Sequence, residues 1–279
     1  YWYQKAAGQG DDQAQYRLGM CYEKGEGVEQ NYAQAAYWYQ KAAEQGDDDA
    51  QAQLGQCYYK GLGVKLDLAQ AVYWWTEAAE QEHTGAQACL GLCYANGQGV
   101  EKNYETAVCW YTKAAEQEHM VAQFKLGVCY AQGRGVAQDW GKAAMWYTKA
   151  AEQGYMSAQV SLGYCYCNGQ GVEKDMRTAA VWWAKAGEQG NAEAQYNVGQ
   201  CWYFGKGIEQ NYEQAVYWYA KAAAQGYACA QFNLGACCEN GDGVGQDLNL
   251  AMSFYTAAAA QGNKNAIAEL NRLNGLMNE

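Results

Sequence analysis

Proline is absent from this chain of 279 residues, histidine occurs only twice and phenylalanine only four times. With no proline, the 33 glycines are the residues that can end a helix, so helices separated by glycine turns are expected. No stretch approaches the roughly 20 continuous apolar residues that a membrane span needs. The net charge of −11 repels phosphate backbones, which argues against nucleic acids as partners.

A fixed period organises the sequence. The pair Leu-Gly, replaced once by Val-Gly, returns every 36 residues without an insertion, with its first residue at Leu18, Leu54, Leu90, Leu126, Leu162, Val198 and Leu234. Seven complete units result, at 11–46, 47–82, 83–118, 119–154, 155–190, 191–226 and 227–262. Residues 1–10 are the second half of an earlier unit, and residues 263–279 are expected to form a C-terminal capping helix. We therefore predict a single solenoid over residues 1–279.

Each unit predicts two helices. The first carries the pattern of Ala14–Tyr22 and stops at Gly-x-Gly-Val, as in Gly25–Val28, where glycine can adopt the left-handed conformation that closes a helix. The second begins at a residue whose side-chain oxygen can cap it, at Asn31, Asp67, Asn103, Asp139, Asp175, Asn211 and Asp247. Gln34, Gln70 and Gln214 stand where a capping box would place them.

Equivalent positions of the units form columns, which we number after the first complete unit. Columns 14, 35 and 42 hold alanine in all seven units, and these small residues let helices approach closely. The tryptophans of column 38 are expected to fill the space beside them, at Trp38, Trp74, Trp110, Trp146, Trp182 and Trp218. One helical hairpin cannot bury such a face, but stacked hairpins can.

The pattern Ala-x-Ala-Gln-x-x-Leu-Gly-x-x-Tyr-x-x-Gly-x-Gly-Val, followed by Asp/Asn-Tyr-x-x-Ala-x-x-Trp-Tyr-x-Lys-Ala-Ala-Glu-Gln-Gly, closely resembles the Sel1-like repeat (SLR) family. This family is related to the tetratricopeptide repeat, and the resemblance covers the whole chain. It implies an all-α, right-handed α/α superhelix of helix-turn-helix repeats that serves as an adaptor or scaffold for protein complexes. Two turns depart from the pattern, where Glu82-His83 and Glu118-His119 replace Gly-x.

Some columns of the first helix stay constant and others drift. At about 100° per residue, the drifting columns 13, 16, 17, 20, 23 and 24 fall in one arc of about 120°, apart from the constant ones. The resemblance to tetratricopeptide repeats places this arc on the concave wall. We predict that a protein partner or extended peptide binds there, at Tyr16, Met20, Lys24, Gln56, Tyr59, Lys60, Leu92, Asn96, Phe124, Val128, Gln132, Tyr164, Asn168, Tyr196, Gln200, Phe204, Phe232 and Asn240. Lys125, Tyr203 and Asn233 belong to the same arc.

This arc combines aromatic and amide side chains. Aromatic rings supply rigid contact area, and amides can bond to the backbone of a peptide through both donor and acceptor. The alternative is that these positions face solvent and are free to vary, with column 16 partly buried between repeats. We favour a binding groove, because a row of exposed Tyr and Phe is unusual on an idle surface.

Seven of the twelve cysteines occupy one column: Cys21, Cys57, Cys93, Cys129, Cys165, Cys201 and Cys237. Equivalent positions in adjacent repeats are at least about 9 Å apart, given normal helix packing, and a disulfide needs Cα atoms closer than roughly 7 Å. We expect this column to be small buried apolar residues, and we expect all the thiols to be reduced, which favours a cytoplasmic location. The other five, Cys89, Cys109, Cys167, Cys229 and Cys238, form no second regular column.

Candidate chemistry is sparse. His83 and His119 occupy equivalent turns and are expected to be surface features and not metal ligands. No nucleophile–base pair stands out, and Gly-x-Gly-Val follows a helix, so it is a turn and not a dinucleotide fingerprint. We predict no enzyme activity, no cofactor and no metal. Two alternatives stay open, a Cys-rich metal-binding or redox module and a hydrolase-like secreted repeat protein.

The two ends differ in pattern. Ile267, Leu270, Leu273 and Met277 continue an apolar stripe that suits a terminal helix. Trp2 and Tyr3 would lie on an open repeat edge, so more repeats or another domain, and with them a targeting segment, are expected before Tyr1. A monomer is expected unless this open edge self-associates.

Overall fold

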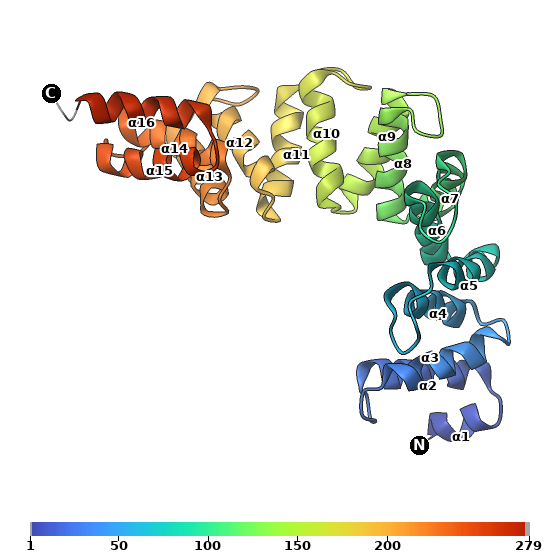
Figure 1. Ribbon diagram of the computed structural model, residues 1–279. Coiled ribbons are helices and arrows are strands. Elements are labelled where there is room, and N and C mark those ends of the chain that lie inside the picture. Colours follow the sequence, from blue (N-terminus) through green and yellow to red (C-terminus); the bar gives the residue numbers. More distant parts are fainter. Residues whose placement is uncertain (1, 277–279) are drawn as a thin grey trace. The chain divides into compact units, whose positions relative to one another are not determined.

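The computed structural model describes residues 2–276, in which all regular secondary structure is helical. The helices are α1 (Trp2–Gly8), α2 (Asp12–Lys24), α3 (Tyr32–Ala43), α4 (Asp48–Lys60), α5 (Leu68–Glu80), α6 (Thr84–Asn96), α7 (Tyr104–Glu116), α8 (Met120–Gln132), α9 (Trp140–Glu152), α10 (Met156–Asn168), α11 (Met176–Glu188), α12 (Ala192–Phe204), α13 (Tyr212–Ala224), α14 (Ala228–Asn240), α15 (Leu248–Ala260) and α16 (Lys264–Leu276). They divide into two compact units, residues 1–149 and residues 150–279. In each unit consecutive helices pack in pairs, such as α2 with α3 and α12 with α13 (Figure 1). The all-α repeat fold predicted from the period is confirmed, and the boundaries of the single domain stay a prediction.

The helix ends form as the sequence predicted. Gly25 closes α2 with a φ of 74°, and its N–H donates to the Cys21 carbonyl oxygen (2.8 Å). Asn31 caps α3, since its Oδ1 accepts from the Gln34 N–H (3.0 Å), and the equivalent Asn and Asp residues cap the other second helices in the same way. The capping box is only half formed, because the Asn31 N–H donates to the Tyr22 carbonyl oxygen (2.8 Å).

The two helices of a pair meet where the glycine of Leu-Gly faces an aromatic ring of the second helix. These rings form column 39 and are buried, at Tyr39, Trp75, Tyr111, Tyr147, Trp183, Tyr219 and Tyr255. A Cβ atom added to Gly91 would lie 2.4 Å from Tyr111 Cδ1, so a larger residue does not fit there. The invariant glycine therefore makes room for the ring.

The tryptophans one position earlier pack less completely than the sequence led us to expect. Trp146 and Trp218 are buried, whereas the other members of column 38 are only half-buried. Several of these rings are covered by the lysine that follows three residues later in the sequence. Lys185 Nζ, for example, lies 4.1 Å from the centroid of Trp182. Column 39, and not column 38, therefore fills the centre of each pair.

A buried glutamine in column 15 ties successive repeats together. Gln87 on α6 donates through Nε2 to the Ala79 carbonyl oxygen at the end of α5 (3.3 Å). Its Oε1 accepts from Gln117 Nε2 after α7 (2.9 Å), so one side chain bonds both second helices. Gln195 makes the same two bonds in the second unit. These bonds satisfy amide groups whose burial would otherwise cost free energy.

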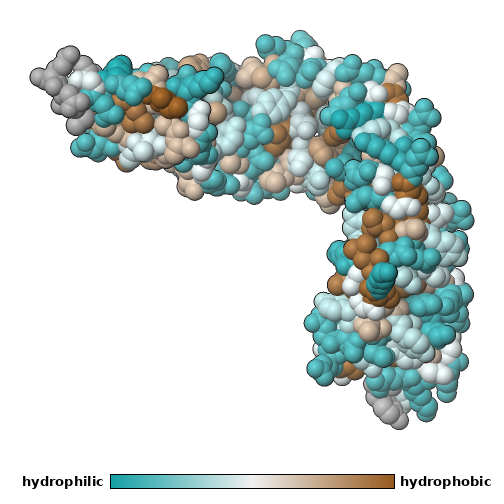
Figure 2. Space-filling model, viewed as in Figure 1, coloured by the Kyte–Doolittle hydropathy of each residue, from teal (hydrophilic) through white to brown (hydrophobic). Residues whose placement is uncertain are grey.

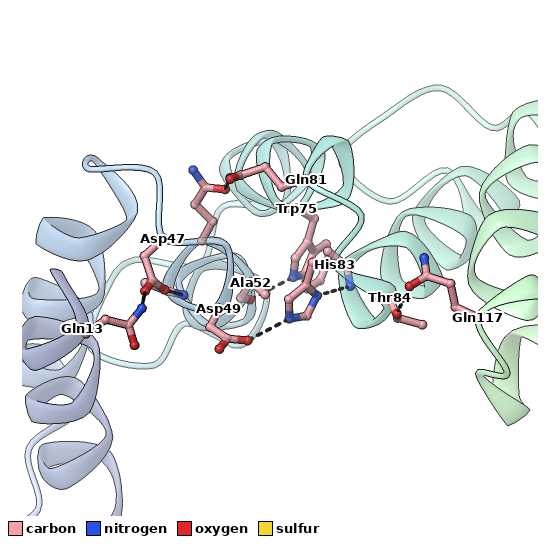
Figure 3. A network of polar contacts seen from close by, with 12 residues as sticks. Gln13, Asp47, Asp49, Ala52, Trp75, Gln81, His83, Thr84 and Gln117 are labelled. Carbon is pink, nitrogen blue, oxygen red and sulfur yellow. Dashed lines mark hydrogen bonds and ion pairs between the residues drawn. The ribbon is translucent and has the colours of Figure 1, made fainter.

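The two turns that depart from the repeat pattern keep its geometry. Glu82 and Glu118 adopt left-handed φ values of 67° and 64°, where the other turns have glycine. His83 then caps α6, since its Nδ1 accepts from the Ala86 N–H (3.0 Å), and His119 caps α8 through Ala122 (3.2 Å). Figure 3 shows His83 also reaching back to the first helix of the previous repeat, where its Nε2 lies 3.4 Å from Asp49 Oδ1. The histidines are therefore helix caps.

The column of cysteines lies in the core, apart from the half-buried Cys21. Burial raises the pKa of the Cys93 thiol to about 12 and that of Cys165 to about 11. Such thiols are protonated near neutral pH and are weak nucleophiles. The column is thus a packing position, as expected.

The last described helix differs in one respect from the predicted stripe. Leu273 is buried and Leu270 packs against the core, but Ile267 is 43% exposed, and Ala266 takes the buried place beside it. Met277 lies outside the described residues. Within residues 2–276 no helix is both long and apolar enough to cross a membrane. The same residues contain no group of three or more His, Cys, Asp or Glu side chains arranged to hold a metal ion.

Candidate partner-binding site

The predicted site residues all lie on first helices, but they are exposed to different degrees. Those near the C-terminal end of each helix are exposed: Lys24, Lys60, Asn96, Gln132, Asn168, Phe204 and Asn240. The others are half-buried: Tyr16, Met20, Gln56, Tyr59, Leu92, Phe124, Val128, Tyr164, Tyr196, Gln200 and Phe232. The row of aromatic residues is thus less open than the sequence led us to expect.

Most of these aromatic side chains pack on the ring of column 39. Tyr16 lies 5.9 Å from Tyr39 between ring centroids, and Phe232 lies 5.6 Å from Tyr255. Tyr164 lies edge-on to Trp183, and its hydroxyl donates to Glu193 (2.6 Å), where burial and this bond raise its pKa to about 12. These residues contribute to packing, as the alternative interpretation of column 16 had it. Phe204, by contrast, is 54% exposed.

A cavity of about 280 Å³ opens between α12 and α14 in the second unit. Tyr203, Phe204, Tyr219, Asn233 and Ala236 line it. The Tyr203 hydroxyl donates to Asp242 (2.8 Å), which fixes its ring beside the opening. Tyr219 is buried, and its hydroxyl has no hydrogen-bond partner of good geometry among the described residues. Burial raises the pKa of Tyr219, and the nearby Asn233 amide offsets part of that rise.

A second cavity, of about 110 Å³, lies between α6 and α8 in the first unit. It brings together three of the predicted residues, Leu92, Asn96 and Val128. Its other lining residues are Ala95, Tyr104, Tyr111, Lys125, Cys129 and Arg134. In Figure 2, hydrophobic side chains gather on the visible face of this unit around α4 and α6, with hydrophilic ones between them.

The two cavities are the same place in two different repeats. Their shared positions are separated by three periods of 36 residues, as in Tyr111 and Tyr219, Val128 and Ala236, and Asn96 and Phe204. Each lies between consecutive first helices, above a column 39 ring. We call this feature the notch and name each one after its ring. The Tyr111 notch and the Tyr219 notch are therefore equivalent sites with different linings.

Elsewhere a carboxylate occupies the equivalent position. The Tyr39 hydroxyl donates to Glu23 (2.5 Å), and the Tyr255 hydroxyl donates to Glu239 (2.8 Å). Burial and these bonds raise the pKa of both tyrosines. Glu239 is further held by Arg272 of α16. Column 23 therefore places a bonded carboxylate beside Tyr39 and Tyr255, whereas it holds Ala95 at the Tyr111 notch and Tyr203 at the Tyr219 notch.

Sequence reasoning missed several lining residues. Tyr111 and Tyr219 lie on second helices, and Tyr104 and Arg134 lie outside the first-helix arc. The recurrence of an aromatic in column 39 was visible in the sequence, but nothing marked it as the floor of a cavity. Lys125, Tyr203 and Asn233 were on the predicted arc without being among the predicted site residues.

Comparison with known protein families identifies the repeat. The Sel1 repeat matches residues 1–11, 12–47, 48–83, 85–119, 121–155, 157–191, 192–227 and 230–263. The chain belongs to the Sel1 repeat family. Its fold is therefore that of a Sel1-repeat solenoid, which commonly serves as a protein-interaction scaffold and is generally not enzymatic.

Two solved structures resemble the chain over almost its whole length. One is c5321, a protective antigen of uropathogenic Escherichia coli with an SLR fold (39% identity, TM-score 0.95, 98% of this chain covered). The chain spans only 58% of that protein. The other is a Sel1 repeat protein from Oxalobacter formigenes (35% identity, TM-score 0.76, covering 97% of this chain and 78% of that one). Among curated proteins, none matches the chain.

Proposed function

We propose that the chain binds a protein partner through an extended segment that lies on the first helices and inserts side chains into the notches. Binding, and not catalysis, is the proposed activity. The observation that carries this proposal is the recurrence of the notch at equivalent positions in both units, each time above a column 39 ring and with walls from drifting columns 17, 20, 23 and 24. A constant scaffold with variable openings is suited to selecting particular side chains.

The Tyr219 notch has the properties of an anchoring pocket. Its walls are aromatic, with ring centroids of Tyr203 and Phe204 4.9 Å apart, and rigid aromatics are frequent at energetically dominant positions of interfaces. The Asn233 amide adds a polar group to its lining. An inserted side chain with an apolar body and a polar tip would match this lining.

The test is selection of peptides from a displayed random library on the intact chain, followed by affinity measurements on two matched variants. Ala236→Phe fills the Tyr219 notch, and Ala220→Phe makes the same change on the exposed surface of α13. We expect Ala236→Phe to weaken the selected peptides about tenfold or more and Ala220→Phe to leave them unchanged, since only the former blocks the cavity. The corresponding variant for the Tyr111 notch is Val128→Trp. A selection that yields no binder, or binders indifferent to both notches, would overturn the proposal.

A further inference from the structure

The Tyr111 notch gathers positive charge in an acidic chain. The chain has 30 acidic and 19 basic residues, yet Lys125 and Arg134 both line this notch, and Lys102 lies near the ring of Tyr104, another lining residue. Lys102 Nζ lies 5.0 Å from the centroid of the Tyr104 ring, and Arg134 Cζ lies 5.4 Å from the same centroid. Tyr104 thus has a cation near its ring from each of two different loops.

Within residues 2–276 the two lining cations have no acidic partner. Within the described residues neither Lys125 nor Arg134 forms an ion pair, and the Arg134 guanidinium instead donates to the Tyr104 hydroxyl (3.4 Å). Glu101 and Glu105, which are near in sequence, make no ion pair with them either. The charges are therefore available to a ligand.

The pKa of the Cys129 thiol reflects the charges that line the notch. Burial raises the pKa of its thiol, and Arg134 and Lys125 both oppose that rise. At the equivalent thiol of the Tyr219 notch, Cys237, burial again raises the pKa, and Asp242 adds to that rise. Of the two notches, the one over Tyr111 is thus the cationic one.

The rest of the lining limits what the anion can be. Leu92, Ala95 and Val128 supply apolar walls, and the Asn96 amide can donate at the rim. A cavity of about 110 Å³ admits one side chain, not a nucleotide. An apolar stem with a carboxylate at its end fits both the walls and the two cations.

We propose that the Tyr111 notch binds the carboxylate side chain of a Glu or Asp residue of the partner, between Lys125 and Arg134. This inference rests on the proposed function, because it names the chemistry that one notch selects. The Tyr219 notch provides an internal contrast, since Asn233 and Asp242 occupy the positions of Lys125 and Arg134. That notch should not accept a carboxylate.

The test converts one notch into the other. The double variant Lys125→Asn/Arg134→Asp carries residues that the same fold already accommodates in the second unit. Its matched control is Lys65→Asn/Lys174→Asp, which makes the same change in net charge at exposed positions between α4 and α5 and between α10 and α11. The probes are peptides selected on the intact wild-type chain and dependent on the Tyr111 notch, each compared with its Glu→Gln or Asp→Asn counterpart. Thermal unfolding checks that the variants fold.

We expect the acidic peptides to bind the double variant with an affinity about tenfold or more lower than that for the wild type. Their affinity for the control variant should be unchanged. We also expect Glu→Gln in the peptide to weaken binding to the wild type but not to the double variant. Added salt should reduce the difference in wild-type affinity between the Glu and Gln peptides. Peptides that are blocked by Val128→Trp yet indifferent to Glu→Gln would overturn the carboxylate assignment and leave the proposed function standing. Absence of any peptide dependent on the notches would overturn both.

Discussion

The ring of Tyr219 lies over Gly199 so closely that a Cβ atom on the glycine would come 2.5 Å from Tyr219 Cδ1. Alanine normally stabilises a helix relative to glycine by about 1 kcal/mol, but here the methyl group would displace a ring that is itself enclosed. We therefore expect Gly199→Ala to lower the free energy of unfolding by about 1–3 kcal/mol, measured by denaturant titration. The control is Gly275→Ala in α16, where the added Cβ would meet no described atom within 4 Å beyond its own stretch of helix. Equal stability of the two variants would contradict this account of the Leu-Gly pair.

Glu82 holds a left-handed backbone conformation with a φ of 67°. This conformation costs a residue with a Cβ atom about 1 kcal/mol or more relative to glycine. We expect Glu82→Gly to raise the free energy of unfolding by about 0.5–1 kcal/mol. The same substitution at Glu80, the last residue of α5, should lower it, by up to about 1 kcal/mol. A loss of stability in both variants would show that the turn is not strained.

Tyr219 and Tyr255 occupy one column but differ in their hydroxyl groups. Within residues 2–276 the Tyr219 hydroxyl makes no hydrogen bond of good geometry, although the Asn233 amide is near it, whereas that of Tyr255 donates to Glu239 (2.8 Å). We expect Tyr255→Phe to cost about 1–2 kcal/mol of stability, and Tyr219→Phe to be neutral or stabilising, because it removes an unsatisfied buried group. Thermal or chemical unfolding of both variants measures the contrast. A larger loss at Tyr219 would mean that its hydroxyl is satisfied in solution.

His119 caps α8 as a hydrogen-bond acceptor, which requires that its Nδ1 be unprotonated. Burial lowers its pKa below the ordinary value of 6.5, so the unfolded chain takes up a proton at a higher pH than the folded chain does. The contribution of His119 is therefore present above about pH 6.5 and is lost as the pH falls towards the lowered pKa. We expect His119→Asn, which keeps the cap, to lose less stability than the wild type between about pH 8 and pH 5. Parallel pH dependences would contradict this role of the cap.

The sequence predicted the helices well, because each unit contains residues that start and end its helices. Gly25 and Asn31 stand at the ends of their helices for reasons local to the backbone, and the period repeats them. It predicted the packing less well. Trp38 and Tyr39 are adjacent and both apolar, and nothing in the spacing shows which ring the neighbouring glycine accommodates. Ile267 is exposed for a related reason, since Ala266 occupies the buried position beside it.

The candidate site could be predicted only in part. The variation of residue type between repeats located Leu92, Asn96, Val128 and Phe204. These residues lie where one face of the first helix is free of packing constraints. The variation could not locate Tyr111 or Arg134, because a cavity depends on which gaps between neighbouring helices remain unfilled. The cover of Glu23 over Tyr39 is likewise a property of side-chain geometry that a periodic pattern does not contain.

The most direct test of the central claim is photo-crosslinking of a selected peptide to the intact chain. A benzoylphenylalanine would replace Asn96 or Asn240, at the exposed ends of first helices, or Tyr73 or Tyr217, which are 50% exposed on second helices. We expect the peptide to be crosslinked by the benzoylphenylalanine at position 96 or 240, and we expect an excess of unlabelled peptide to prevent the crosslink. Attachment from positions 73 and 217 with little or none from 96 and 240 would contradict the central claim.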